Sequence, residues 1–171
     1  QNPEAHNPVF NDIAKATIIQ CPDLLDLGAK NEHLIYYPVD TDFLLPDYSM
    51  KGEGKLVVGH FPSNPNVKGT EQVLEIFRRI EAQSTVVKFV YGDRRVSWLK
   101  NIERMMQCDV IVENESDEQN GKQYGEWGNT ALEAAALGCI VVTRHTASHL
   151  YKKNYGVEAP VLRSGAEVEL K

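Results

Sequence analysis

This chain of 171 residues has no long apolar run, no cluster of basic residues and no closely spaced cysteines. No apolar stretch approaches the length of a transmembrane span, and no signal peptide is recognisable. Lysine and arginine never occur more than two in a row, and the net charge is −6, which argues against binding to nucleic acid or an anionic membrane. The cysteines, Cys21, Cys108 and Cys139, are too far apart for a metal or redox motif. They indicate reduced, buried thiols in a cytoplasmic protein.

What the sequence does contain is a regular alternation of apolar strands and amphipathic helices. With 42% hydrophobic and 25% charged residues, its length and composition are those of one globular domain. Because the strands are apolar without interruption, they predict a parallel sheet covered by helices on both faces, a doubly wound, Rossmann-like α/β fold. Strands are expected at Lys55–Gly59, Val86–Tyr91, Val110–Val112 and Ile140–Thr143, and helices at Thr70–Gln83, Trp98–Gln107 and Thr130–Leu137.

The helix expected over Thr70–Gln83 has the clearest pattern. Its apolar residues recur at i, i+3, i+4 and i+7, the spacing of one buried helix face, and Thr70 is the predicted N-cap. The first forty residues carry weaker signals, namely a short helix at Phe10–Ala14, another after Pro22, and strands at Thr17–Gln20 and Leu34–Tyr37.

Three loops follow predicted strands, namely His60–Gly69, Gly92-Asp93 and Glu113–Asn129. In a doubly wound sheet, ligands bind at the carboxyl ends of the strands, close to the point where the strand order changes direction. These loops should therefore lie together on one edge of the sheet, and they predict a binding site there.

The last of these loops leads into the most informative segment of the chain. Gly125 and Gly128 let the backbone approach a ligand closely, and Asn129 or Thr130 is expected to cap the helix that follows. The free N–H groups at such a helix start bind anions well. Glu133 lies one turn further, where its carboxylate can reach a sugar hydroxyl beside a bound diphosphate. The T-x-x-E spacing of Thr130 and Glu133 is equally that of a capping box, which only stabilises the helix.

Three stretches, Tyr37–Pro46, Val57–Thr70 and Gly125–Thr143, occur in an order and spacing that resembles a known family. They are similar to the P-N-G-V-D-x-x-x-F-x-P segment, the strand–loop–K-G segment and the E-G-F-G-x-x-x-x-E-A motif of retaining glycosyltransferases of the GT-B fold. This large group includes the sucrose and glycogen synthase relatives, and the resemblance is to its carboxyl-terminal, donor-binding domain. It covers roughly residues 34 to 165.

The resemblance implies one half of a GT-B fold, acting without metal or cofactor on a UDP- or GDP-linked sugar and on an acceptor glycan or small molecule. In the family, the lysine of the K-G pair holds the donor phosphates, and the second acid of the motif binds the ribose. Lys68 and Glu133 stand at these positions. The backbone N–H groups of Gly128, Asn129 and Thr130 would then hold the diphosphate.

Two positions depart from the family pattern. Gly125 stands where the first motif acid is expected, and the candidate catalytic residue is Glu126, one position later. Glu126 either supplies this carboxylate from a shifted turn or is an ordinary surface acid. A glycine-rich subset of the family carries an upstream D-x-x-x-G stretch, which Asp117–Gly121 fits. His60 stands where many members have a phosphate-binding arginine, but the family subset with an H-x-P-S sequence is matched by His60, Pro62 and Ser63. His60 is therefore a candidate donor-binding residue.

No metal site is predicted. Asp40-Thr41-Asp42 has the form of a D-x-D metal motif, but it lies between Pro38 and Pro46 and is expected to form a turn. His145 and His149 have the i, i+4 spacing of a helical zinc pair, but no third ligand follows at a recognisable spacing.

The resemblance also divides the chain. Residues 1–33 are expected to be the remnant of a preceding acceptor-side domain or a linker, and residues 34–171 a donor-binding domain truncated at its C-terminus. The missing N-terminal domain would then be a partner, and no nucleic acid is expected. Two other functions stay open. A sugar-nucleotide epimerase of the same fold would use His60, Glu126 and Glu113, and the third possibility is a non-catalytic nucleotide-binding or scaffolding module.

Overall fold

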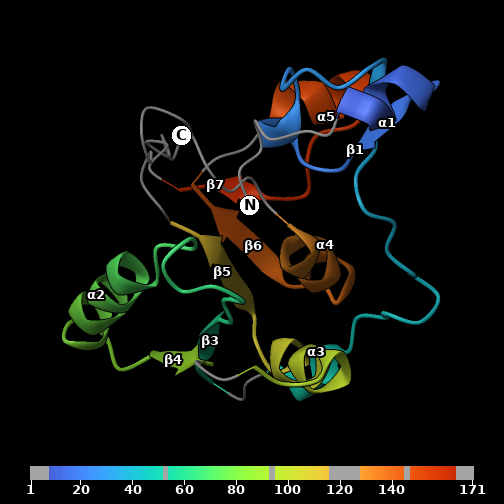
Figure 1. Ribbon diagram of the computed structural model, residues 1–171. Helices are drawn as coiled ribbons and strands as arrows, with labels where there is room; N and C mark the ends of the chain where they lie inside the picture. Colours follow the sequence, from blue (N-terminus) through green and yellow to red (C-terminus); the bar gives the residue numbers. More distant parts are fainter. Residues whose placement is uncertain (1–7, 52–53, 93–94, 116–127, 145–146, 165–171) are drawn as a thin grey trace.

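The computed structural model describes residues 8–51, 54–92, 95–115, 128–144 and 147–164. Its main body is a five-stranded parallel sheet with helices on both faces, and a two-stranded sheet lies to one side near α5 (Figure 1). The main strands are β3 (Leu56–His60), β4 (Val87–Tyr91), β5 (Val110–Asn114), β6 (Ile140–Thr143) and β7 (Leu162–Arg163). The helices are α1 (Pro8–Ile13), α2 (Thr70–Glu81), α3 (Trp98–Met106), α4 (Asn129–Ala136) and α5 (Ser148–Tyr155), with 3₁₀ turns at η1 (Pro22–Leu24) and η2 (Tyr48–Met50). This architecture confirms the predicted doubly wound α/β fold.

The strands of the main sheet lie in the order β4-β3-β5-β6-β7, and every neighbouring pair is parallel. Leu56 to His60 pair in register with Val87 to Tyr91 on one side of β3, and Val58 pairs with Val110 on the other side. The chain therefore leaves β3 in one direction to form β4, and then crosses to the other side of β3 to form β5. This change of direction is the switch point, between β3 and β5, at which ligands of such sheets bind.

One face of the sheet packs against α2. Val73 and Phe77 of α2 are buried against Val58 of β3, as the predicted helical spacing requires. The Phe77 ring also stacks on Phe89 of β4, with ring centroids 3.9 Å apart. The parallel sheet and the amphipathic α2 therefore form where the sequence predicts them.

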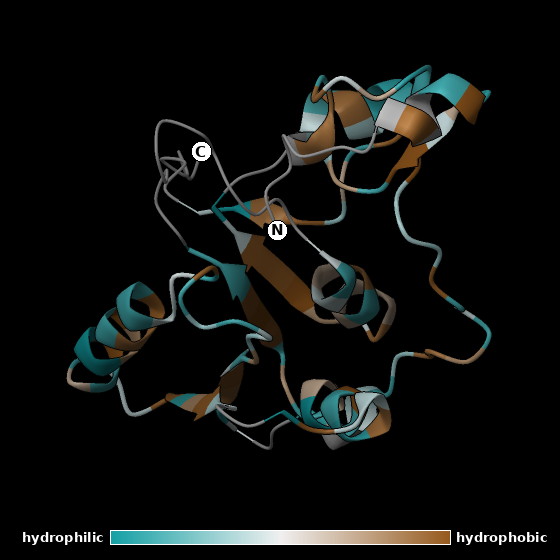
Figure 2. Ribbon diagram, in the orientation of Figure 1, coloured by the Kyte–Doolittle hydropathy of each residue, from teal (hydrophilic) through white to brown (hydrophobic). Residues whose placement is uncertain are grey.

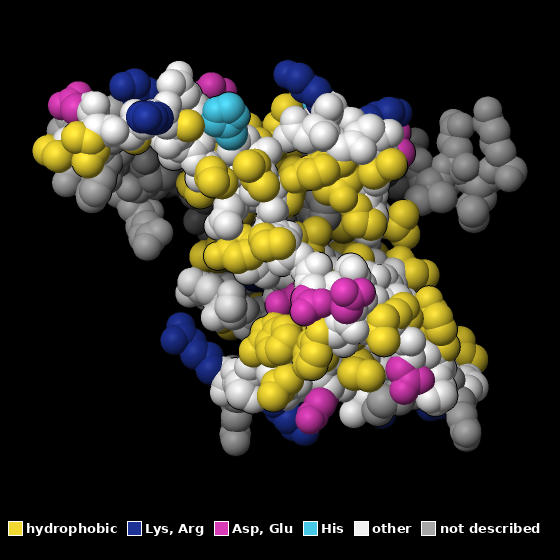
Figure 3. Space-filling model, turned by 90° about the vertical axis from the view of Figure 1, so that its right-hand side faces the viewer, with side chains coloured by type: hydrophobic (Ala, Val, Ile, Leu, Met, Phe, Trp, Pro, Cys, Tyr) yellow, Lys and Arg dark blue, Asp and Glu magenta, His cyan; other side chains and the backbone are white. Residues whose placement is uncertain are grey.

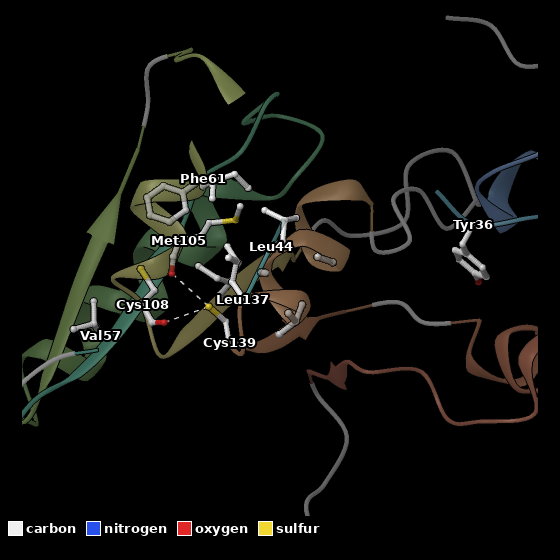
Figure 4. Close-up of a cluster of buried hydrophobic side chains, with 13 residues drawn as sticks. Tyr36, Leu44, Val57, Phe61, Met105, Cys108, Leu137 and Cys139 are labelled. Atoms are coloured by element: carbon white, nitrogen blue, oxygen red, sulfur yellow. Dashed lines mark hydrogen bonds between the residues drawn. The ribbon is translucent and has the colours of Figure 1, made fainter. Parts of the chain in front are cut away.

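The opposite face of the sheet packs against α3 and α4 and holds the larger core, whose side chains are drawn in Figure 4. Figure 2 shows the apolar strands β5 and β6 at the centre of the molecule. Cys139 donates hydrogen bonds from its thiol to the carbonyl oxygens of Met105 (3.4 Å) and Cys108 (3.3 Å) (Figure 4). Burial raises the pKa of the Cys108 thiol to about 12. Cys108 and Cys139 are therefore buried thiols, as predicted, whereas Cys21 is only half-buried.

The smaller sheet pairs β1 (Thr17–Ile19) with β2 (Glu32–Leu34) in parallel and is joined to α5. The Tyr36 ring contacts the rings of Tyr151 and Tyr155, with centroids 5.3 and 6.0 Å away. The Tyr36 N–H donates to the Tyr155 hydroxyl (3.1 Å), and the Asn154 side chain donates to the Leu34 carbonyl (3.1 Å). β2 spans the predicted boundary between residues 33 and 34, and that division stays a prediction. None of the described helices is both long and apolar enough to cross a membrane.

Some predicted details are wrong. The strand expected at Leu34–Tyr37 lies earlier, at Glu32–Leu34, and β5 runs two residues beyond Val112. The N-cap of α2 is Gly69, whose φ of +62° lies in the left-handed region, and no side chain caps this helix. Thr70 does not cap the helix, because its hydroxyl is hydrogen-bonded to the side chain of His60 at the end of β3.

Candidate functional site

The carboxyl ends of β3, β5 and β6 bring together polar side chains that are almost completely buried. These are His60, Glu113, Asn114, Glu115 and Thr143, all at most 8% exposed. Burying a polar group costs free energy unless a hydrogen bond replaces its lost water. A cluster of this kind at the switch point of the sheet is therefore the strongest candidate for a functional site.

At its centre, Lys68 forms an ion pair with Glu113. Lys68 stands in the loop between β3 and α2, and Oε1 of Glu113 at the end of β5 accepts from its ammonium group. The two side chains are 16% and 3% exposed. Burial raises the pKa of the Glu113 carboxyl, although Lys68 and the Gly128 N–H oppose this effect. The N–H of Glu115 donates to the Lys68 carbonyl (3.2 Å), which fixes the loop against the end of β5.

The start of α4 lies directly against this ion pair. Gly128 is the N-cap, and its N–H is directed at the Glu113 carboxyl. A Cβ atom at position 128 would lie 3.5 Å from Oε1 of Glu113 and 3.9 Å from Nζ of Lys68. Asn129 and Thr130 are the first helical residues, so their N–H groups have no acceptor within the helix. The prediction that either side chain caps the helix is wrong, because the N-cap is a glycine and no side-chain cap forms.

His60 is at the end of β3 and is completely buried. It is 0% exposed, and its Nδ1 lies 2.8 Å from the Val112 carbonyl while its Nε2 lies 2.9 Å from the Thr70 hydroxyl. Because a carbonyl only accepts, Nδ1 carries the proton and Nε2 accepts from Thr70. Burial lowers the pKa of His60, with Lys68 acting in the same direction. His60 therefore ties β3 to β5 and to α2, and both of its ring nitrogens are engaged by protein groups.

Glu133 lies in the second turn of α4, and its side chain is hydrogen-bonded to Trp98. The indole N–H of Trp98 donates to Oε1 of Glu133 (2.7 Å), and the indole stacks on Phe43 with ring centroids 5.7 Å apart. The capping box is excluded, because the N-cap of α4 is Gly128 and not Thr130, and no side-chain cap forms. Trp98 and Phe43 are 49% and 57% exposed. Figure 3 shows this side of the molecule, where hydrophobic side chains gather with carboxylates among them.

Glu133 and Trp98 line two clefts. The first, of about 430 Å³, is lined by Phe61, Pro62, Ser63, Gly92, Arg95, Val96, Trp98, Asn101, Arg104, Asn129, Thr130 and Glu133. The second, of about 310 Å³, shares Trp98, Asn129 and Glu133 with it. A small cavity of about 10 Å³, the space of roughly one water molecule, touches Lys68 and Glu113 and shares Thr130 with the first cleft. The ion pair and Glu133 therefore line two neighbouring cavities that share Thr130.

Other predicted residues lie away from this site or outside the described residues. Asp40 forms the expected turn, since its Oδ1 accepts from the N–H groups of Asp42 (3.0 Å) and Phe43 (3.1 Å). Glu126, Gly125, Asp117–Gly121 and His145 lie outside the described residues. Within the described part of the chain, no three His, Cys, Asp or Glu side chains are grouped so that they could hold a metal ion.

Sequence reasoning missed two important residues of the site. Glu113 entered only as a candidate for epimerase chemistry, although an acid directly after the apolar run Val110–Val112 marks a carboxyl end of a buried strand. Trp98 enters only as the first residue of a predicted helix, but it is half exposed and binds Glu133. No pattern of local spacing predicts that contact, because 35 residues separate the two side chains.

Comparisons of the chain with protein-family models, with curated proteins and with solved structures found no match. A function is therefore inferred from the residues of the site and their geometry.

Proposed function

We propose that this chain is the nucleotide-sugar donor-binding domain of a retaining glycosyltransferase, which transfers the sugar to an acceptor together with an acceptor-binding domain. The observation that supports the proposal most strongly is the Lys68–Glu113 ion pair, which lies next to Gly128 at the switch point of a doubly wound sheet. This arrangement offers a diphosphate an ammonium group and, in the same small site, the N–H groups of Asn129 and Thr130, which have no acceptor within the helix.

The charge around the site supports an anionic ligand. Lys68 borders the small cavity, and Arg95 and Arg104 line the first cleft, which shares Thr130 with that cavity. Three cationic side chains therefore line these two cavities against two carboxylates, Glu113 and Glu133, although the protein as a whole carries a net charge of −6. In the proposed complex, Lys68 and the N–H groups of Asn129 and Thr130 hold the diphosphate of the donor.

Glu133 is the proposed ribose ligand. Its carboxylate lines the cleft beside Asn129 and Thr130, one turn along the helix whose start would hold the diphosphate. A carboxylate accepts several hydrogen bonds, so Glu133 can bind ribose hydroxyls while Trp98 holds one of its oxygens. The indole would thus position the carboxylate. Glu126 is the proposed catalytic carboxylate, and the retaining outcome follows from the family resemblance alone.

A second candidate function is a non-catalytic nucleotide-binding module. This module is supported by the contacts of Glu113 and Glu133, the acids of the described residues that lie close to the start of α4, because Lys68 and Trp98 already engage them. The epimerase alternative receives less support, because His60 is fully buried with both ring nitrogens bonded and does not reach a sugar ring.

Incubation of the full-length protein with labelled UDP-, GDP- and ADP-sugars, with and without a panel of glycan and small-molecule acceptors, distinguishes these functions. Transfer of label to an acceptor is the expected result. Exchange of the sugar epimer would favour the epimerase, and binding without turnover would favour the module. A protein that binds none of the nucleotide sugars would contradict all three.

A further inference from the structure

One oxygen of the proposed donor site is buried without a partner. Lys68 holds Oε1 of Glu113, but Oε2 has no hydrogen-bond partner among the described residues and is shielded from solvent. The side chain is only 3% exposed, and the small cavity beside it is lined by Lys68 and Thr130. An unpartnered buried carboxylate oxygen is costly, and so it points to a further interaction at this place.

A diphosphate that binds Lys68 changes the electrostatics of Glu113. The ammonium group would turn toward a phosphate oxygen, and Glu113 would be left as a buried anion next to a second anion. Like charges in a poorly hydrated site favour the neutral form of a carboxyl group. A protonated Glu113 would remove this repulsion and would gain an O–H donor on the side of the unpartnered oxygen.

We infer that Glu113 takes up a proton when a nucleotide diphosphate binds, and donates a hydrogen bond from Oε2 to a phosphate oxygen. The proton comes from the solvent and forms an O–H bond at Oε2, Lys68 keeps its charge, and no other covalent bond changes. Glu113 is then a specificity-determining residue, because its O–H and Lys68 together recognise a diphosphate group. This inference rests on the proposed donor-binding function.

The titratable and polar groups that surround Glu113 indicate that Glu113 itself, and not a neighbour, takes up the proton. Among the charged side chains of the described residues, Lys68 is the one whose charge acts on the Glu113 carboxyl. From β3, His60 contributes a neutral ring whose pKa burial lowers. From β5, Glu115 accepts at Oε2 from the Ser164 hydroxyl (2.7 Å). β6 contributes Thr143, and the first turn of α4 carries no acid. Burial already raises the pKa of Glu113 before any ligand arrives.

Isothermal titration calorimetry of the chain with UDP-glucose and with GDP-mannose tests the inference. Both ligands are diphosphate diesters, which do not titrate near neutral pH. Titrations at one pH in PIPES and in Tris, whose ionisation enthalpies differ, measure the protons taken up on binding. We expect an uptake approaching about one proton for each diphosphate, and a Kd that rises by up to about tenfold per pH unit above neutrality.

Two variants assign the proton. Glu113→Gln should bind the same ligand without proton uptake, and its Kd should not depend on pH. Glu115→Gln should take up a proton and show the pH dependence of the wild type. The buffer comparison on the wild type decides even if Glu113→Gln does not fold. Binding with equal enthalpy in both buffers would overturn the inference and leave the donor-binding function standing. Uptake that persists in Glu113→Gln would also overturn it. If neither nucleotide sugar binds, both the inference and the proposed function fail.

Discussion

A histidine as completely buried as His60 is neutral in the folded protein, because its ring nitrogens serve the Val112 carbonyl and the Thr70 hydroxyl. Its pKa in the folded state is lower than the value near 6.5 in the unfolded chain. Below that value the unfolded chain binds a proton that the folded protein does not bind. The stability that His60 supplies is therefore fully present above pH 6.5 and is lost as the pH falls through its folded pKa.

Urea unfolding of the wild type and of His60→Asn between pH 7.5 and 5 measures this effect. We expect the variant to be less stable at pH 7.5 by about 1–3 kcal/mol, because buried partners lose their hydrogen bonds. As the pH falls, the difference between the two proteins should shrink, by at most about 1.4 kcal/mol per pH unit. Parallel pH profiles would show that His60 is not held neutral.

Glu133 offers a second test at the scale of one residue. In Glu133→Gln the amide oxygen can still accept from the Trp98 indole, so we expect near-normal thermal melting. If Glu133 binds ribose hydroxyls, the variant should nevertheless bind UDP or GDP with an affinity reduced by about tenfold, or roughly 1.4 kcal/mol. Melting with and without nucleotide measures both quantities, and the exposed acid Glu103, changed to Gln, is a control. A lower melting temperature, with the same increase on addition of nucleotide as in the wild type, would mean that Glu133 stabilises the fold but does not bind the nucleotide.

At the scale of elements, the packing of β3 against its neighbours depends on Gly59. A Cβ atom there would lie 2.7 Å from Sγ of Cys108, 2.8 Å from Cε2 of Phe61 and 3.0 Å from Cδ1 of Ile111. Gly59→Ala should therefore destabilise the protein by about 1–3 kcal/mol, measured by urea unfolding. The double variant Gly59→Ala/Cys108→Ala should show a favourable coupling energy between the two changes, because Cys108→Ala removes one of the clashing atoms. Strictly additive losses would contradict this packing.

The same scale shows what local sequence patterns can predict. The strands β3, β4 and β6 and the helices α2 and α3 form within one or two residues of the expected ranges, because their burial follows directly from apolar spacing. Helix starts were predicted less well. Thr70 has the residue type of an N-cap, but its hydroxyl donates to the buried His60, so a tertiary contact overrides the local preference. α5 has no buried residues, so its sequence carries no apolar stripe from which a helix could be predicted.

At the scale of the whole molecule, the sequence predicts the edge of the sheet that carries the site but not its internal contacts. Lys68 and the start of α4 were expected to meet, and Gly128 lies against the Lys68–Glu113 pair. The partner of Lys68 could not be predicted, since 45 residues separate it from Glu113 and only the β3–β5 pairing brings them together. The burial of His60 likewise depends on strands that close around it. Sequence motifs thus predict the edge of the sheet that carries the candidate site, while the fold decides which of its polar groups are buried and which line a cavity.

The central claim is that Lys68 binds the phosphates of a nucleotide. The direct measurement is calorimetry of the wild type and of Lys68→Ala with UDP and GDP, and with uridine and guanosine. Because Lys68→Ala leaves Glu113 buried without its partner, the same comparison is made in the Glu113→Gln background. A charged hydrogen bond to phosphate is worth roughly 1.5–3 kcal/mol, so the affinity for the diphosphate should fall by about tenfold to a hundredfold while the affinity for the nucleoside is unchanged. Equal losses for nucleotide and nucleoside, or a wild type that binds no nucleotide, would contradict the account.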